Sequence, residues 1–237
     1  MKLASRMQRL GTETAFEVLV RARALEAQGR DVIHLEIGEP DFDTPANVSA
    51  AGANAIHEGW THYGPAPGQL DLRQVIADYI NTRTGNSYGP GNVVVTPGGK
   101  PIMFFLITAL LEEGDEAIFP DPGFPIYRSM IDFVGAKAVP LPIREENDFR
   151  LDVSELESLI TPRTKFLIIN SPANPTGGVF TRADLKAIAD LAVKHDLFVM
   201  ADEIYAEIIY DGEHFSITSF PGMVERTAIL DGFSKTY

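Results

Sequence analysis

Short apolar segments alternate with segments of helical pattern from about residue 92 to the end of the chain, and this alternation constrains the fold more than any other feature. The apolar segments predict strands at residues 93–95, 117–119, 138–141, 166–169, 198–201 and 228–230. The segments between them predict helices at residues 101–112, 124–134, 152–160 and 181–195. Strands that are apolar throughout are typical of parallel sheets covered on both faces. The sequence therefore predicts an α/β fold in which a mostly parallel sheet carries helices on both faces.

The chain before residue 92 follows a less regular pattern. Helices are predicted at residues 14–28, 46–57 and 69–84, with Gly29 ending the first of them. The turn-rich stretches "GEPDFDTP" and "THYGPAPGQ" separate these helices. A short strand is also predicted at the start of "VIHLEIGEPDFDTP", before the loop that begins at Gly38. This region is otherwise expected to be helical and to stand apart from the regular alternation.

Composition limits the partners that the protein can have. Twenty Lys and Arg against thirty-three Asp and Glu give a formal net charge of −13, which repels the phosphates of nucleic acids and of anionic membranes. No apolar run is long enough to span a bilayer, and the first residues lack the apolar core of a signal peptide. We therefore expect a cytoplasmic protein that binds neither nucleic acid nor membrane.

The residue types also limit the chemistry. The chain contains no cysteine, which excludes disulfides, thiolate nucleophiles and cysteine-ligated metals. Its five histidines show no metal-ligand spacing such as HExxH, and no G-x-S-x-G elbow of a serine hydrolase is present. The sequence thus predicts no metal site.

In an open parallel sheet, ligands bind beyond the carboxyl ends of the strands, so the residues after each predicted strand are the candidates for a site. The first such segment is "TPGGKP", in which Gly98 and Gly99 precede a helix near Lys100. Backbone N–H groups at this helix start could hold a phosphate, or the glycines could form a plain connector. The segment is not a P-loop, because Val94 stands where the first glycine of that motif would be.

Three further segments also follow predicted strands. "PDPGFPIY" contains Phe124, which could stack on a flat ligand or belong to the core. "NSPANPTGG" contains Asn174, whose amide can donate and accept hydrogen bonds, although turn chemistry alone would explain this loop. "ADEIY" contains Asp202, a carboxylate at a buried edge that needs a cationic partner unless it caps a helix. Tyr205 lies on the same side if the chain turns helical there.

The segments also occur in a characteristic order. "IGEPDF", "HYGPAPGQLDLR", "TPGGK", "NSPANPTG", "ADEIY" and "GFSK" together resemble the fold-type I pyridoxal-phosphate enzymes, specifically the class I and II aminotransferases. The resemblance covers nearly the whole chain. It implies a PLP-dependent transaminase, which transfers an amino group from an L-amino acid to a 2-oxo acid through pyridoxal 5′-phosphate.

The resemblance implies a role for four of the candidates. Lys235 of "GFSK" corresponds to the lysine that forms a Schiff base with the cofactor and then transfers a proton. Asp202 corresponds to the carboxylate that pairs with the pyridinium nitrogen. Tyr205 and Asn174 correspond to the groups that hydrogen-bond the ring oxygen. Lys235, Asp202 and Tyr205 are thus the expected catalytic residues.

The remaining candidates would surround the cofactor and the substrate. Phe124 corresponds to an aromatic residue stacked on the ring, and the turn formed by Gly98, Gly99 and Lys100 corresponds to the phosphate site, chiefly through backbone N–H groups. Gly38 lies in the segment "IGEPDF", which resembles the loop that contacts the substrate carboxylate through its backbone. Asn174 is also expected to contact the substrate. Tyr63 corresponds to a tyrosine that reaches the phosphate of the neighbouring subunit, which implies a homodimer.

The resemblance also implies a domain division and a missing part. Residues 1–45 would be an N-terminal arm and part of the small domain, and residues 46–237 would be the large cofactor-binding domain. Because the family continues well beyond the lysine, we expect the C-terminal part of the fold to be absent here and the 237 residues alone to be inactive. Two other functions stay open: a PLP-dependent carbon–sulfur lyase or decarboxylase on the same fold, and a truncated chain that only binds the cofactor or a partner.

Overall fold

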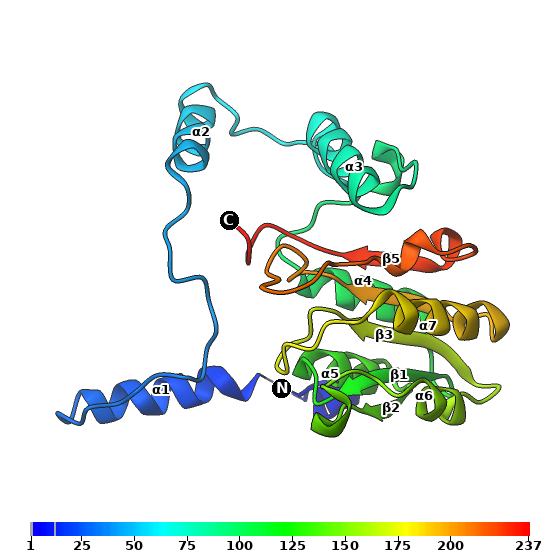
Figure 1. Ribbon diagram of the computed structural model, residues 1–237. Helices are drawn as coiled ribbons and strands as arrows, with labels where there is room; N and C mark the ends of the chain where they lie inside the picture. Colours follow the sequence, from blue (N-terminus) through cyan, green and yellow to red (C-terminus); the bar gives the residue numbers. More distant parts are fainter. Residues whose placement is uncertain (1, 12) are drawn as a thin grey trace.

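The computed structural model describes residues 2–11 and 13–237, and five strands form one sheet within it (Figure 1). The strands are β1 (Glu116–Asp121), β2 (Lys137–Pro142), β3 (Thr164–Asn170), β4 (Phe198–Asp202) and β5 (Thr227–Leu230). Their order is β2-β1-β3-β4-β5, and every neighbouring pair is parallel. The predicted parallel sheet is confirmed.

Helices cover both faces of this sheet, as predicted. They are α4 (Lys100–Leu110), α5 (Pro125–Val134), α6 (Val153–Leu159) and α7 (Arg182–Lys194). On one face, α4 and α5 pack against the sheet in a cluster that includes Met103, Ile107, Ile131, Phe166 and Met200. On the other face, α6 and α7 pack in a cluster that includes Leu156, Leu185, Ile188, Leu167 and Val199. Successive strand side chains point to opposite faces, so one buried apolar strand supplies both cores.

The short strand predicted just before Gly38 is wrong, because residues 32–37 form no strand, and the predicted strand at residues 93–95 is wrong as well. Residues 93–95 form no strand, and the side chain of Val94 is 64% exposed. The N–H of Val95 donates to the carbonyl of Pro67 at 2.9 Å, an isolated bond to a loop. A valine-rich stretch favours extended backbone, but a strand also needs a partner strand to complete its hydrogen bonds, and residues 93–95 have none within the described ranges.

The N-terminal part of the chain reaches away from the sheet (Figure 1). Its helices are α1 (Thr14–Glu26), α2 (Ala46–His57) and α3 (Leu70–Thr84), close to the predicted bounds. Figure 1 shows α1 and α2 apart from the sheet and α3 beside β5. The described residues of α1 bury only Ala22 and those of α2 bury none, so neither helix packs into the core.

Short 3₁₀ helices complete the described structure. They are η1 (Ser5–Arg9), η2 (Pro90–Asn92), η3 (Glu145–Asn147), η4 (Ile217–Ser219) and η5 (Val224–Arg226). The segment after η1 is fixed to α5, because the N–H of Gly11 donates to Ser129 Oγ at 2.9 Å.

No helix in the described part of the chain combines the length and the apolar character needed to cross a membrane.

Candidate active site

Because all five strands are parallel, their carboxyl ends meet at one edge of the sheet, and the predicted site residues gather there. Asp202 is the last residue of β4 and lies between Asn170 of β3 and Leu230 of β5. The amide of Asn170 donates to the backbone carbonyl of Asp202 at 3.0 Å, which fixes the end of β4. The backbone of Asp202 is therefore held on both sides by neighbouring strands.

The Asp202 carboxylate is 3% exposed and has neutral partners. Tyr127 Oη donates to its Oδ2 at 2.5 Å, and the N–H of Ile204 donates to its Oδ1 at 3.3 Å. Burial raises the pKa of Asp202 to about 6; the Tyr127 hydrogen bond opposes this shift, whereas the charges of Asp231 and Glu203 add to it. No cation pairs with Asp202 within the described residues, so the carboxylate would be stabilised by a cationic ligand.

Tyr127 was not among the predicted site residues. It lies on α5, one turn after Phe124, and is fully buried. The rings of Phe124 and Tyr127 meet edge to face, with centroids 5.7 Å apart. Burial, followed by the charge of Asp202, raises the pKa of Tyr127 well above its ordinary value, so this hydroxyl stays a donor. The signal in the sequence is a tyrosine on an apolar helix face, since a buried tyrosine needs a hydrogen-bond partner.

Tyr205, Asn174, Lys235 and Gly38 come together on the same edge. Burial raises the pKa of the Tyr205 hydroxyl, the charge of Asp202 raises it further, and a hydrogen bond with the Asn174 side chain lowers it. Lys235 Nζ lies 5.9 Å from the centroid of the Tyr205 ring. The same ammonium group donates to the carbonyl of Gly38 at 3.4 Å. Four residues that are far apart in the sequence thus share one site.

The turn before α4 has the geometry of an anion site. Gly98 has a φ of +91°, a conformation that favours glycine. The N–H groups of Gly99 and Lys100 have no acceptor in the described part of the chain, and they stand at the start of an 11-residue helix. The Lys100 ammonium contacts Glu13 at 3.0 Å and the ring of Phe16 at 5.8 Å, outside the turn. Backbone N–H groups are therefore what the turn offers to a phosphate.

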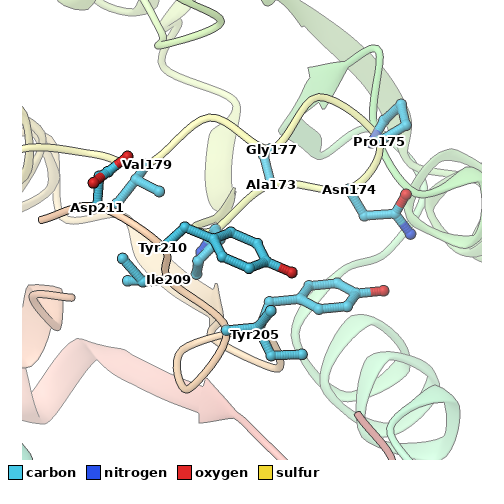
Figure 2. A pocket seen from close by; sticks show the side chains of 11 residues that line it. Ala173, Asn174, Pro175, Gly177, Val179, Tyr205, Ile209, Tyr210 and Asp211 are labelled. Carbon is cyan, nitrogen blue, oxygen red and sulfur yellow. The ribbon is translucent and has the colours of Figure 1, made fainter. Parts of the chain in front are cut away.

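A cavity of roughly 500 Å³ opens beside Asn174 and Tyr205, a volume typical of small-molecule sites. Figure 2 shows its two walls, one formed by residues 172–179 and the other by residues 205–211. Tyr210 lines the cavity yet is 94% exposed, so it lies at the opening. This side of Asn174 and Tyr205 is open to molecules of substrate size.

Tyr63 is the one predicted site residue that the structure keeps away from the others. It lies on the segment between α2 and α3, which Figure 1 shows away from the edge that carries Asp202. Its side chain is fully exposed. Its predicted contact with a neighbouring subunit stays a prediction.

Metal-ligating side chains do not gather in the site: no group of three or more His, Asp or Glu that could hold a metal ion occurs in the described part of the chain.

Comparison with known proteins decides the family. Residues 30–237 match the family described as aminotransferase class I and II. The chain belongs to this family. It is 40% identical over 223 residues to the arginine–pyruvate transaminase of Pseudomonas aeruginosa, covering 94% of this chain and 57% of that protein. It is 39% identical to the aromatic-amino-acid aminotransferase 2 of Thermococcus litoralis, covering 100% of this chain and 60% of that protein.

The fold of this aminotransferase chain also matches solved structures. Aspartate aminotransferase from Thermus thermophilus, solved with maleate, superposes with a TM-score of 0.95 at 39% identity and covers 99% of this chain and 61% of that chain. The chain therefore spans about 60% of the length of the relatives it matches. The predictions of fold type I, of the aminotransferase family and of pyridoxal 5′-phosphate as its cofactor are confirmed.

The side chains and backbone groups gathered at this edge fit this cofactor. A pyridinium nitrogen is a cation, and Asp202 is a buried carboxylate whose described partners are neutral. A phosphate needs donors, and Gly99 and Lys100 present free N–H groups at a helix start. An aldehyde needs a primary amine, which Lys235 supplies on the same edge.

Proposed function

We propose that the protein to which this chain belongs is an aminotransferase that moves an amino group from an L-amino acid to a 2-oxo acid. The observation that carries the proposal is the buried Asp202 carboxylate with its Tyr127 donor, on the same sheet edge as Lys235. The relatives in this family support transfer, because their names are those of arginine–pyruvate, aspartate and aromatic-amino-acid aminotransferases. No observation in the described residues favours a lyase or decarboxylase.

Each residue has a separate task in this proposal. When bound, the cofactor supplies an electron sink for charge that develops on the substrate carbon. Lys235 would hold the cofactor through Nζ; once the substrate's amine has displaced it, the freed Nζ would act as the base that takes the proton from the substrate carbon and as the acid that returns it. Asp202 keeps the ring nitrogen protonated, because its carboxylate accepts the N–H hydrogen bond. Tyr127 in turn orients Asp202 by donating to Oδ2.

Other residues bind and orient. Tyr205 and Asn174 hydrogen-bond the ring oxygen, and Phe124 packs on the ring from the start of α5. The turn of residues 98–100 takes the phosphate. Gly38 binds the substrate carboxylate through its N–H and not its carbonyl, because the carbonyl would repel a carboxylate and accepts a hydrogen bond from Lys235.

The test is product analysis on the protein made from its complete gene. With pyridoxal 5′-phosphate, an L-amino acid donor and pyruvate or 2-oxoglutarate, we expect one new amino acid for each 2-oxo acid formed. Aspartate, arginine and phenylalanine are the first donors to test, since relatives carry these specificities in their names. Ammonia released with pyruvate, without a second amino acid, would contradict transfer and indicate a lyase.

A homodimer with shared sites is part of the same proposal. Large apolar side chains on the N-terminal part are exposed, among them Ile56 at 67%, Trp60 at 63% and Tyr63 at 108%. A second copy of the chain would cover this surface and bring Tyr63 to the phosphate of its neighbour. Light scattering is expected to give twice the mass of one subunit.

Mixed dimers test the shared site directly. Tyr63→Ala is expected to weaken cofactor binding by roughly ten- to a hundredfold, since it removes a hydrogen bond to a charged group. Lys235→Ala is expected to be inactive. A dimer of one Tyr63→Ala and one Lys235→Ala chain would hold one intact site, so random mixing should restore roughly a quarter of the wild-type activity. Activity no greater than that of the unmixed Tyr63→Ala protein would contradict a shared site.

The chain divides near residue 45, between an N-terminal arm with part of a small domain and the large cofactor-binding domain. The protein works in the cytoplasm, which suits a chain without cysteine because that compartment is reducing.

A further inference from the structure

A second buried carboxylate stands directly after Asp202. Glu203 is 3% exposed, and it extends the sheet by donating its N–H to the carbonyl of Leu230 at 2.8 Å. Its side chain has its own set of partners, away from Tyr127. Ser216 Oγ donates to Oε1 at 2.7 Å, and His214 Nε2 lies 3.0 Å from Oε2. None of these contacts has a part in the roles assigned so far.

One arginine joins Glu203 to the segment that carries Lys235. Arg83, at the end of α3, donates from Nη2 to Glu203 Oε2 at 2.6 Å and from Nη1 to Asp231 Oδ2 at 3.0 Å. Asp231 directly follows β5 and precedes Lys235 by four residues. The Arg83 side chain is only 14% exposed. A single guanidinium group therefore bridges the ends of β4 and β5.

Arg83 is held as a cation in this position. Burial alone would lower its pKa, but Glu203, Tyr79 and Asp231 together raise it above the ordinary value. Tyr79 accepts a hydrogen bond from Nη1 at 3.3 Å, and Glu207 lies 3.7 Å from the same nitrogen. The planar guanidinium group bonds the two carboxylates through two separate nitrogens, Nη2 and Nη1, whose relative geometry is fixed. An ammonium group has a single nitrogen and lacks this fixed geometry.

We propose that Arg83 is a positioning residue of the cofactor site: by bridging Glu203 and Asp231, it fixes the Asp202 end of β4 against the Lys235 segment and offsets part of the negative charge of the two carboxylates beside Asp202. The inference rests on the proposed function in one respect, since Asp202 and Lys235 matter because they hold the cofactor. It adds a residue on α3, outside the strand ends on which the site was predicted.

The charges around Asp202 give the proposal a pH dependence. Asp202 faces Tyr127 from α5, Tyr205 from the turn after β4, and the carboxylates of Glu203 and Asp231. Removing the Arg83 charge leaves Glu203 with only Ser216 and His214 as side-chain partners and takes the bonded guanidinium away from Asp231. The added negative charge beside Asp202 makes Asp202 ionise at a higher pH. Cofactor binding needs the ionised form and should therefore fail at a higher pH as the solution is acidified.

The test compares Arg83→Met with a matched variant at the opposite edge of the sheet. Glu116 is 1% exposed and bonds Arg163 at 2.7 Å, Lys137 at 3.0 Å and Thr161 at 2.6 Å. Arg163→Met therefore also removes an arginine from a buried carboxylate, but far from the site. Arg83→Lys keeps the charge without the fork, and Asp231→Asn removes one carboxylate; these two milder variants decide the question if Arg83→Met does not fold.

Two measurements on the protein made from its complete gene give the outcome. Without cofactor, amide hydrogen exchange in peptides covering residues 200–205 and 229–235 should rise at least tenfold in Arg83→Met and stay unchanged in Arg163→Met. With pyridoxal 5′-phosphate, the dissociation constant should rise at least tenfold and its pH midpoint should move up by roughly one unit. Arg83→Lys should restore the pH midpoint and only part of the affinity.

Equal effects of Arg83→Met and Arg163→Met on local exchange would overturn the role of Arg83, and so would an unchanged pH midpoint in a chain that binds the cofactor. Failure of the wild-type protein to bind pyridoxal 5′-phosphate would instead count against the proposed function. In that case the exchange comparison, which uses no cofactor, still decides whether Arg83 fixes the two strand ends.

Discussion

Replacing Lys235 by alanine is expected to abolish covalent attachment of pyridoxal 5′-phosphate. It is also expected to lower the rate of transamination by roughly a hundredfold to ten-thousandfold, which is the range that a positioned acid–base group contributes. The reason is chemical: in the proposed function the same atom, Nζ of Lys235, bonds the aldehyde and moves the proton. Borohydride reduction makes the bond between lysine and cofactor permanent, so peptide mapping of the reduced wild-type protein should find the pyridoxyl group on residue 235.

The control for this prediction is another half-exposed lysine. Lys165 Nζ contacts Asp115 at 2.7 Å at the opposite edge of the sheet, so Lys165→Ala should keep covalent attachment unchanged. Lys100 is the more demanding comparison, because it borders the phosphate turn. A pyridoxyl label on Lys100 or Lys165 in the wild-type protein would show that the assignment of Lys235 is wrong.

The parallel sheet was predictable because its strands carry their own signal. The central residues of β3 and β4, 166–169 and 198–201, are all apolar, and a polar loop and the clearly periodic helix α7 lie between the two strands. Buried strands of this kind can be predicted from the local sequence alone, without information on residues far away in the chain. Residues 93–95 have the same local character, yet they form no strand, because pairing depends on a partner that the local pattern does not specify.

The site was predictable to the extent that strand ends define it. Asp202 ends β4, and Tyr205 and Asn174 lie within a few residues of the ends of β4 and β3, so the topology alone brings them to one edge. Tyr127 and Arg83 were missed because they act through contacts between elements. Tyr127 reaches Asp202 across 75 positions of sequence, and Arg83 reaches Glu203 across 120. Only packing fixes such pairs.

Asp202→Asn is expected to weaken cofactor binding and to stabilise the cofactor-free chain. The amide cannot hold the ring nitrogen protonated, so the dissociation constant should rise by roughly ten- to a hundredfold and transamination should fall further, by about a hundred- to a thousandfold. Stability changes in the other direction because Asp202 is destabilised by burial: its pKa is raised from 3.8 to about 6 in the folded chain.

The pH dependence of unfolding separates these two effects. Between about pH 4 and pH 6 the folded chain binds more protons at Asp202 than the unfolded chain, so wild-type stability falls as pH rises through that window and the loss is complete at pH 7. A shift of this size corresponds to a difference on the order of 3 kcal/mol. Cofactor-free Asp202→Asn should therefore unfold at higher denaturant than wild type at pH 7, and at the same denaturant below pH 4.

Asp184→Asn is the control of opposite sign for this experiment. Burial alone would raise the pKa of Asp184, but hydrogen bonds from Thr181 and the charge of Arg150 lower it, so its ionised form stabilises the chain. Asp184→Asn should accordingly be less stable than wild type at pH 7. If Asp202→Asn also lost stability at pH 7 and kept normal turnover, Asp202 would be a structural cap for the turn at Ile204, and the cofactor would need a different partner for its ring nitrogen.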